Sequence, residues 1–176
     1  MNAQTLSNAV GCPLSVAETF ADYLTSAMEE FDIGTPARQA AFLAQIGHES
    51  GSFHYTAEIW GPTDWQKRYE GRLDIGNIYP GDGERFKGRG LIQITGRDNY
   101  TLAAEALCID CVNKPEILEK PEWACVSAAW WWNAHGCNRL SDNGQFDRIT
   151  RTINGGMNGN EDRHARWERA KRVLCA

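Results

Sequence analysis

The amino-acid sequence predicts a mainly α-helical domain, and three observations carry that prediction. Apolar residues recur at spacings of three and four, the helical period, along most of the 176 residues. Proline, serine or threonine precedes several of these stretches and glycine follows them, as at the starts and ends of helices. The segment "LIQIT" at 91–95 shows only brief strand-like alternation. We therefore expect helices throughout, with at most a small extended element.

The first expected helix lies between Ser15 and Gly34. Ser15 and Glu18 have the spacing of a capping box, and Gly34 is the expected end. One face of this helix is apolar and consists of Val16, Phe20, Tyr23, Leu24, Ala27, Met28 and Phe31. We expect that face to lie against the core.

A second expected helix ends within "AQIGHESGSFHYTAEIW" (44–60). Thr35 caps its start, Pro36 occupies its first turn, and Gly51 is its natural stop. Its inward stripe consists of Phe42, Gln45, Ile46 and Glu49. Glu49 thus faces the core in the last helical turn, where burial and the helix dipole both disfavour a charged carboxylate. We expect its protonated form to be favoured, which suits a general acid near neutral pH.

The rest of the chain divides into a glycine-rich stretch and further helices. Residues 61–90 should form loops and turns, with one short helix around 64–70. Helical patterns resume at roughly 98–107, 121–134, 143–153 and 160–174. No internal repeat or linker is visible, so a single domain over residues 1–176 is expected.

Composition and charge exclude several classes of protein. A hydrophobic fraction of 42% and seven tryptophans argue against disorder. The net charge of −5 provides no basic surface for nucleic acid and no attraction to anionic membranes. No apolar run reaches the about 18 residues of a transmembrane helix. The start, "MNAQTLSNAVGCPLS", has no Lys or Arg and no long apolar stretch, so no secretory signal is expected.

Six cysteines are present, an even number that permits disulfides without demonstrating them. Cys108 and Cys111 have the C-x-x-C spacing of redox and zinc sites. Cys125 and Cys137 do not form the second close pair that a zinc site needs. Core or loop cysteines are the preferred interpretation, and no metal is expected.

Two glutamates, Glu49 and Glu58, indicate hydrolytic chemistry. Glycoside hydrolysis needs one carboxyl group to protonate the leaving oxygen and another to activate water, about 6.5–9.5 Å apart in an inverting enzyme. A zinc-protease motif is excluded because Gly51 breaks the helix between His48 and His54. On spacing alone, a surface carboxylate at 58 and a capping or salt-bridge residue at 49 remain the simpler interpretation.

Three segments in register resemble glycoside hydrolase family 19: "FLAQIGHESGSF", "FKGRGLIQITGRDNY" and "TINGGMNGNEDR". Over roughly residues 35–175 the chain is most similar to the family's compact lysozyme-like branch of phage and prophage endolysins. The resemblance implies a lysozyme-like helical domain in two lobes with a central cleft. It also implies a single catalytic domain without a separate wall-binding domain.

The resemblance assigns catalytic roles to three residues. Glu49 matches the general acid, and Glu58 matches the general base. Thr95 matches the residue whose hydroxyl holds the attacking water. Burial would keep Glu49 protonated, and a cationic group near Glu58 would keep that residue ionised.

Substrate-binding positions are implied for five further residues. His48 supports the acid, Gln93 and Asn99 hydrogen-bond the sugar, and Asn154 and Arg163 form the far wall of the cleft. The arginine is also expected to orient the base. Simpler roles remain open: Gln93 and Asn99 could cap loops, and Arg163 could be a first-turn residue of the last helix.

The tryptophans receive different expectations. Three consecutive tryptophans at 130–132 cannot share one helical face. We expect Trp130 or Trp131 in the core and leave all three outside the site. Trp60 and Trp65, in the loop-rich stretch after the second glutamate, are better candidates for the cleft.

The resemblance therefore predicts a monomeric endolysin that hydrolyses β-1,4 glycosidic bonds of bacterial peptidoglycan with inversion and without a cofactor. It would be made in the bacterial cytoplasm and reach the wall through a membrane lesion formed by a separate protein. The alternatives are a chitinase on the same scaffold, a non-catalytic saccharide-binding module and a zinc-stabilised structural protein.

Overall fold

The computed structural model describes residues 1–175. Its α-helices are α1 (Ala3–Val10), α2 (Leu14–Glu30), α3 (Pro36–Glu49), α4 (Asp64–Lys67), α5 (Asp82–Arg85), α6 (Arg97–Leu107), α7 (Pro121–Ala134), α8 (Cys137–Asp142), α9 (Phe146–Asn154) and α10 (Asn160–Leu174). Two short 3₁₀ helices, η1 (Leu73–Ile75) and η2 (Pro115–Glu119), flank α5 and α6. The mainly α-helical prediction is confirmed.

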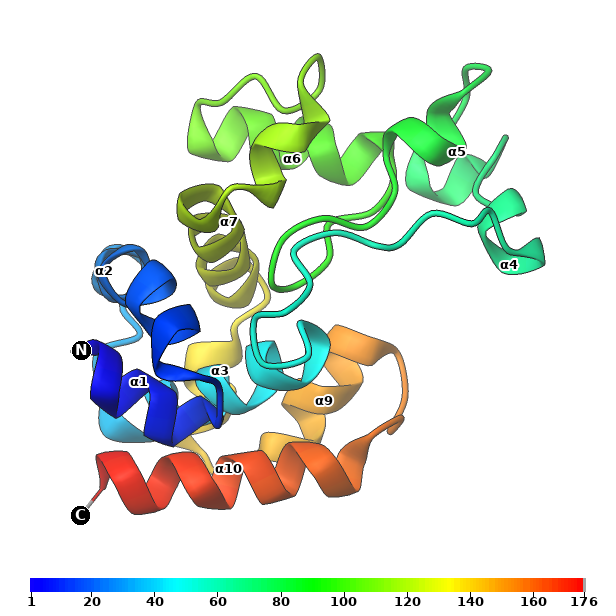
Figure 1. The fold of residues 1–176 in the computed structure, drawn as a ribbon. Helices are drawn as coiled ribbons and strands as arrows, with labels where there is room; N and C mark the ends of the chain where they lie inside the picture. Colours follow the sequence, from blue (N-terminus) through cyan, green and yellow to red (C-terminus); the bar gives the residue numbers. More distant parts are fainter. Residues whose placement is uncertain (176) are drawn as a thin grey trace.

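The helices form two lobes, and α7 runs from one to the other (Figure 1). In the larger lobe, α1, α2, α3, α8, α9 and α10 surround one apolar core, against which α7 also packs. In the smaller lobe, α5, α6 and η2 surround a second core that contains Phe86, Ile94 and Tyr100. The long helix α10 packs along α3, so the C-terminal third of the chain supports the helix that ends in Glu49.

A first crossing segment follows α3 and runs from the larger lobe to the smaller one, and beside it the segment between α5 and α6 loops toward the larger lobe and returns (Figure 1). The Glu58 N–H donates to the carbonyl of Gly88 at 2.8 Å. Arg89 forms isolated antiparallel bridges with Ala57 and with Ile94. These few bonds hold the two segments together, although the segments form no regular sheet.

The short strand expected at 91–95 is not formed. Arg89 and Ile94 exchange two backbone hydrogen bonds, with N···O distances of 3.2 and 2.8 Å, so residues 91–93 form the turn between them. Leu91 and Ile92 are both buried in the larger core. The apolar pattern therefore reflects the burial of a turn, which periodicity alone does not distinguish from a buried strand.

The first predicted helix is present with different ends. α2 begins after Pro13 with no side-chain cap, so the predicted capping box of Ser15 and Glu18 is wrong. The helix ends at Glu30, before Gly34. Most of its predicted apolar face is buried, but Tyr23 is 44% exposed.

The second predicted helix agrees closely with the structure. The Thr35 hydroxyl accepts a hydrogen bond from the Arg38 N–H, Pro36 occupies the first turn, and Glu49 is the last helical residue. The short helix expected near 64–70 is α4, and α6, α7 and α10 match their predicted ranges. Three short α-helices, α1, α5 and α8, were not predicted from the sequence pattern.

Trp132 is the tryptophan of the 130–132 run that fills the core. Its ring is fully buried and meets Phe42 edge to face, with 5.2 Å between ring centroids. Its Nε1–H donates to Asn138 Oδ1 at 2.9 Å, and the Asn138 amide donates to the carbonyl of Phe31 at 3.0 Å. At least one tryptophan of the run was expected in the core; Trp132 fills it, while Trp130 and Trp131, the named candidates, are partly buried and pack against the cores.

A buried ion pair joins α5 to the start of α6 in the smaller lobe. Arg97 donates to both carboxylate oxygens of Asp82, at 2.5 and 2.8 Å, and the Tyr79 N–H donates to the same carboxylate at 3.0 Å. The Asp82 side chain is only 2% exposed. The bonds from Arg97 hold the pKa of Asp82 below its usual range.

None of the helices among residues 1–175 is long and apolar enough to span a membrane.

Replacing Asn138 by Ala should destabilise the protein by about 2 kcal/mol, because the buried Trp132 N–H would lose its acceptor. For a chain of this size, that corresponds to a fall in Tm of about 6 °C. Thermal unfolding followed by circular dichroism would measure the change. Asn143→Ala, at an exposed position just after α8, is the control and should melt close to wild type.

The Asp82 carboxylate should stabilise the fold in a pH-dependent way. Because its pKa is lower in the folded state, its contribution is complete above the unfolded aspartate pKa of about 3.9 and is lost as the pH falls through the folded value. The difference in unfolding free energy between wild type and Asp82→Asn should therefore shrink between about pH 6 and about pH 3 in urea titrations. A difference that stays constant over this range would contradict the assignment. Asp110→Asn, an exposed replacement, is the control.

Candidate active site

The two predicted catalytic glutamates meet in one cavity of about 240 Å³. Glu49 reaches it from the end of α3, and Glu58 from the first crossing segment. Gln93 comes from the turn before α6. Tyr55, Ala57 and Ile59 complete the lining. Three separate stretches of the chain thus bring two carboxylates and one amide to a single concave surface.

Glu49 is held from beneath by a buried arginine. Arg163, from the first turn of α10, is 1% exposed and donates from Nη2 to Glu49 Oε1 at 2.5 Å. Its Nη1 donates to Gln45 Oε1 at 2.5 Å, and its Nε donates to the carbonyl of Asn158. Gln45 in turn donates to the Thr150 hydroxyl at 2.9 Å. This buried network links α3, α9 and α10 at the base of the cavity.

The structure corrects two expectations about charge. Arg163 was predicted to orient Glu58, but it contacts Glu49, because α10 packs along the face of α3 that carries Gln45 and Glu49. The guanidinium also places a positive charge beside Glu49, a contact that the sequence did not predict. The Glu49 side chain is 21% exposed, so water also reaches it.

Glu58 has neutral hydrogen-bond donors in place of the predicted cation. Gln66 donates from Nε2 to Glu58 Oε1 at 3.0 Å, and the Gly88 N–H donates to Oε2 at 3.2 Å. The Tyr69 hydroxyl lies 3.5 Å from Oε1. Burial raises the pKa of Tyr69, and the carboxylate of Glu58 raises it further, so the phenol stays protonated and able to donate. Three neutral donors thus surround the Glu58 carboxylate.

Gln66 is fixed by its own hydrogen bonds. It forms a reciprocal capping box with Thr63 at the start of α4, and its carbonyl oxygen also accepts from the Gly61 N–H at 3.1 Å. Its amide nitrogen donates to the carbonyl of Ile59 as well as to Glu58. The side chain is 4% exposed. The donor that faces Glu58 is therefore held in one orientation.

His48 lies beside the acid candidate but is tied to α10. Its Nδ1 lies 2.7 Å from Asp162 Oδ2, and Arg166 donates to the same oxygen at 2.7 Å. The imidazole also packs on Gly159, where an added Cβ would lie 2.2 Å from the ring. The predicted supporting role agrees with this position, because the ring braces the last turn of α3 against the helix that carries Arg163.

Gln93 enters the cavity through space left by a glycine. A Cβ at Gly88 would lie 2.3 Å from Gln93 Oε1, so a larger residue at 88 would displace the amide. The same Gly88 donates its N–H to Glu58. Gly88 thus leaves room for Gln93 on one wall of the cavity and donates a hydrogen bond to Glu58 on the other.

Among the residues that the structure describes, the other predicted site residues do not line this cavity. Thr95 is half-buried just before α6, and its carbonyl accepts from Asn99 Nδ2 at 2.7 Å. Asn99 therefore caps the local backbone, as its simpler interpretation allowed. Asn154 is exposed at the end of α9.

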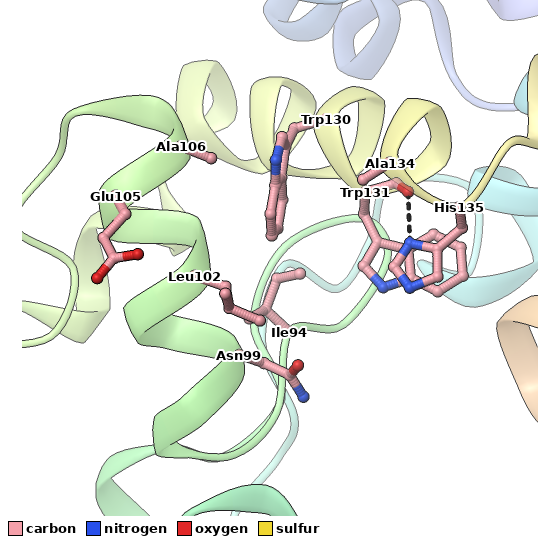
Figure 2. Close-up of a pocket in the computed structure, with 9 residues that line it drawn as sticks. All are labelled: Ile94, Asn99, Leu102, Glu105, Ala106, Trp130, Trp131, Ala134 and His135. Atoms are coloured by element: carbon pink, nitrogen blue, oxygen red, sulfur yellow. Dashed lines mark hydrogen bonds between the residues drawn. The ribbon is translucent and has the colours of Figure 1, made fainter.

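The aromatic candidates are distributed differently from the prediction. Trp60 lines a separate cavity with Gln66, and Trp65 is 60% exposed on α4. Neither lines the cavity of the two glutamates. Trp130 and Trp131, which were left outside the site, line a larger cavity between α6 and α7 (Figure 2).

Four residues of the site were not recognised from the sequence: Gln45, Gln66, Tyr69 and Asp162. Two had a usable signal. Gln45 is a polar residue within an apolar helical stripe, which indicates a buried hydrogen bond. Thr63 and Gln66 have capping-box spacing. The contacts of Tyr69 and Asp162 depend on tertiary packing and have no local signature.

The C-x-x-C cysteines have different environments. Cys111 is fully buried in the smaller core, and burial raises the pKa of its thiol to about 11. Its thiol lies 3.3 Å from the carbonyl of Tyr100. Cys108 is exposed at the end of α6. No cluster of metal-ligating side chains is found among residues 1–175.

Comparison with known proteins identifies the family. Residues 9–143 match the family 19 glycoside hydrolase model, described as chitinase class I. A protein of Haemophilus influenzae described as containing a glycosyl hydrolase family 19 domain is 31% identical over 153 residues, covering 72% of this chain and 74% of that protein. The chain belongs to glycoside hydrolase family 19. The prediction of a glycoside hydrolase is confirmed.

An endochitinase of Arabidopsis thaliana is 36% identical to this family 19 chain over 160 residues. The match covers 83% of this chain but 50% of that protein, so the chain spans about half the length of that plant relative. The crystal structure of chitinase C from Streptomyces griseus superimposes with a TM-score of 0.73 at 24% identity, over 98% of this chain and 77% of that one. This likeness confirms the lysozyme-like helical fold.

Replacing Gln66 by Met should lower glycan hydrolysis by about tenfold, because Glu58 would lose its fixed side-chain donor. The loss should fall mainly on kcat, since Gln66 lies behind Glu58 and not on the lining of the cavity. Lys67→Met, an exposed replacement on the same short helix, is the control. Equal kcat values for the Gln66 variant and wild type would show that this bond is dispensable.

Proposed function

We propose that this family 19 hydrolase is an endolysin that cleaves the β-1,4 glycosidic bonds of peptidoglycan with inversion at the anomeric carbon. The observation that carries the proposal is the pairing of Glu49 and Glu58 on one cavity with unlike partners. Two carboxyl groups in different environments can divide the roles of acid and base.

Glu49 acts as the general acid. Its Oε1 is held by Arg163, while no residue among 1–175 hydrogen-bonds Oε2. Oε2 is therefore the oxygen that carries the proton and gives it to the glycosidic oxygen as the bond to the anomeric carbon breaks. The bound glycan would exclude water from this carboxyl group while the proton is transferred. Hydrogen bonds of this kind often reach their catalytic geometry only with substrate present.

Glu58 acts as the general base. The bonds from Gln66 and Gly88 fix its orientation. It removes a proton from a water molecule, and that water attacks the anomeric carbon on the face opposite the leaving oxygen. Thr95 and Gln93 lie on the adjoining turn and would steady the water and the sugar. The net reaction is the addition of one water across one glycosidic bond.

Peptidoglycan is the proposed substrate because three segments of the sequence, taken in their order along the chain, resemble the endolysin branch of the family. A bacterial protein with a family 19 domain is also among its relatives. As an endolysin, the protein would be synthesised in the bacterial cytoplasm. It would act as a monomer on the glycan strands of the wall after a separate protein has opened the membrane.

Chitin is the second candidate substrate. The specific observation in its favour is that the plant relative is described as an endochitinase and the superimposed structure as a chitinase. Both polymers contain β-1,4-linked N-acetylglucosamine, so the two glutamates serve either substrate.

The decisive experiment compares wild type and Glu49→Gln on purified bacterial sacculi and on chitin oligosaccharides. Wild type should release fragments with new reducing ends from sacculi, and Glu49→Gln should be slower by about 10²–10⁴-fold. Fragment mass identifies the cleaved bond, and nuclear magnetic resonance of the fresh product identifies the anomer. Glu18→Gln, a replacement on the exposed face of α2, is the control.

Three outcomes would change the proposal. Hydrolysis of chitin oligosaccharides without any release from sacculi would move the substrate to chitin. Retention of the anomeric configuration would exclude single displacement. Equal rates for wild type and Glu49→Gln would show that Glu49 is not the acid.

A further inference from the structure

A cavity of about 510 Å³ lies between α6 and α7 (Figure 2). Ile94, Leu102 and Trp130 point toward one another across it. Ala106 and Ala134 add further apolar surface. A cavity of this size, lined mainly by apolar and aromatic groups, is typical of sites for small ligands or ligand substituents.

Two of the polar groups that line the cavity are already hydrogen-bonded within the protein. The Asn99 amide already donates to the carbonyl of Thr95. The Nδ1–H of His135 donates to the carbonyl of Trp131, and the two rings stack with centroids 3.8 Å apart. The Glu105 carboxylate is directed away from Trp130 (Figure 2). The mainly apolar lining therefore suits a substituent that carries apolar groups.

The cavity adjoins the candidate active site through two neighbouring residues of the chain. Gln93 lines the cavity of the two glutamates, and the next residue, Ile94, lines the apolar cavity. Successive Cα atoms are about 3.8 Å apart. Asn99 joins the same turn through its bond to Thr95. A glycan bound over Gln93 would thus hold a substituent of the adjoining sugar within reach of the apolar cavity.

We propose that this cavity receives the start of the peptide substituent of a peptidoglycan strand. The methyl groups of the lactyl ether and of the first alanine suit Ile94, Leu102 and Trp130. The rest of the peptide would leave toward solvent past the exposed His135. The inference rests on the proposed function and deepens it, because an unsubstituted N-acetylglucosamine polymer has no group of this kind.

The test uses peptidoglycan strands from one preparation, half of them treated with an amidase that removes the peptides and leaves the glycan intact. Wild type should show a kcat/KM about tenfold higher on the peptide-bearing strands, the effect of burying one apolar group of this size. Leu102→Gln should reduce that ratio toward one while keeping the rate on stripped strands. Leu102 is 54% exposed, so its replacement is compatible with folding.

Trp130→Ala should reduce the ratio in the same way, with a thermal melt to verify its fold. Leu14→Gln, at a similarly exposed leucine on α2, is the matched control and should keep the wild-type ratio. Equal wild-type rates on both kinds of strand would overturn the inference while leaving the proposed function intact. A parallel loss on stripped strands and chitin oligosaccharides in Leu102→Gln would overturn it in favour of a sugar-binding cavity. Absence of cleavage on any peptidoglycan strand would refute the proposed function itself.

Discussion

The active-site geometry depends on one buried cation. Arg163 is almost fully removed from water, and its guanidinium is matched by the carboxylate of Glu49, the amide oxygen of Gln45 and a backbone carbonyl. An unpaired charge in this position would be strongly destabilising. The requirement that all its donors be satisfied therefore fixes α10 against α3, and with it the place of Glu49.

The second carboxylate depends on a different kind of support. Glu58 stands on a crossing segment without regular structure, and its position follows from the backbone of Gly88 and the rigid amide of Gln66. The acid candidate is thus anchored to the large helical lobe, and the base candidate to the irregular connection between lobes. This division gives each carboxylate its own electrostatic environment, and it also means that their separation depends on how the two lobes are held together.

The sequence predicted the parts of the molecule whose causes are local. The start and end of α3 follow from Thr35, Pro36 and the glycine after Glu49, and the structure agrees. The errors occurred where tertiary packing decides. The partner of Arg163 depends on which face of α3 meets α10, and the buried tryptophan of the 130–132 run depends on the rotation of α7. The apolar pattern at 91–95 indicated a short strand or extended element, but it belongs to a buried turn. A buried turn and a short strand give the same apolar pattern.

Gly88 shows how a residue with no side chain can restrict which substitutions a protein tolerates. Even the smallest change, to alanine, would push Gln93 from one wall of the cavity and disturb the segment that donates to Glu58. The displaced amide is the group that is proposed to hold the sugar. Substitutions at position 88 should therefore be rare in proteins that keep this hydrolytic activity. Gly88 itself takes no part in the reaction.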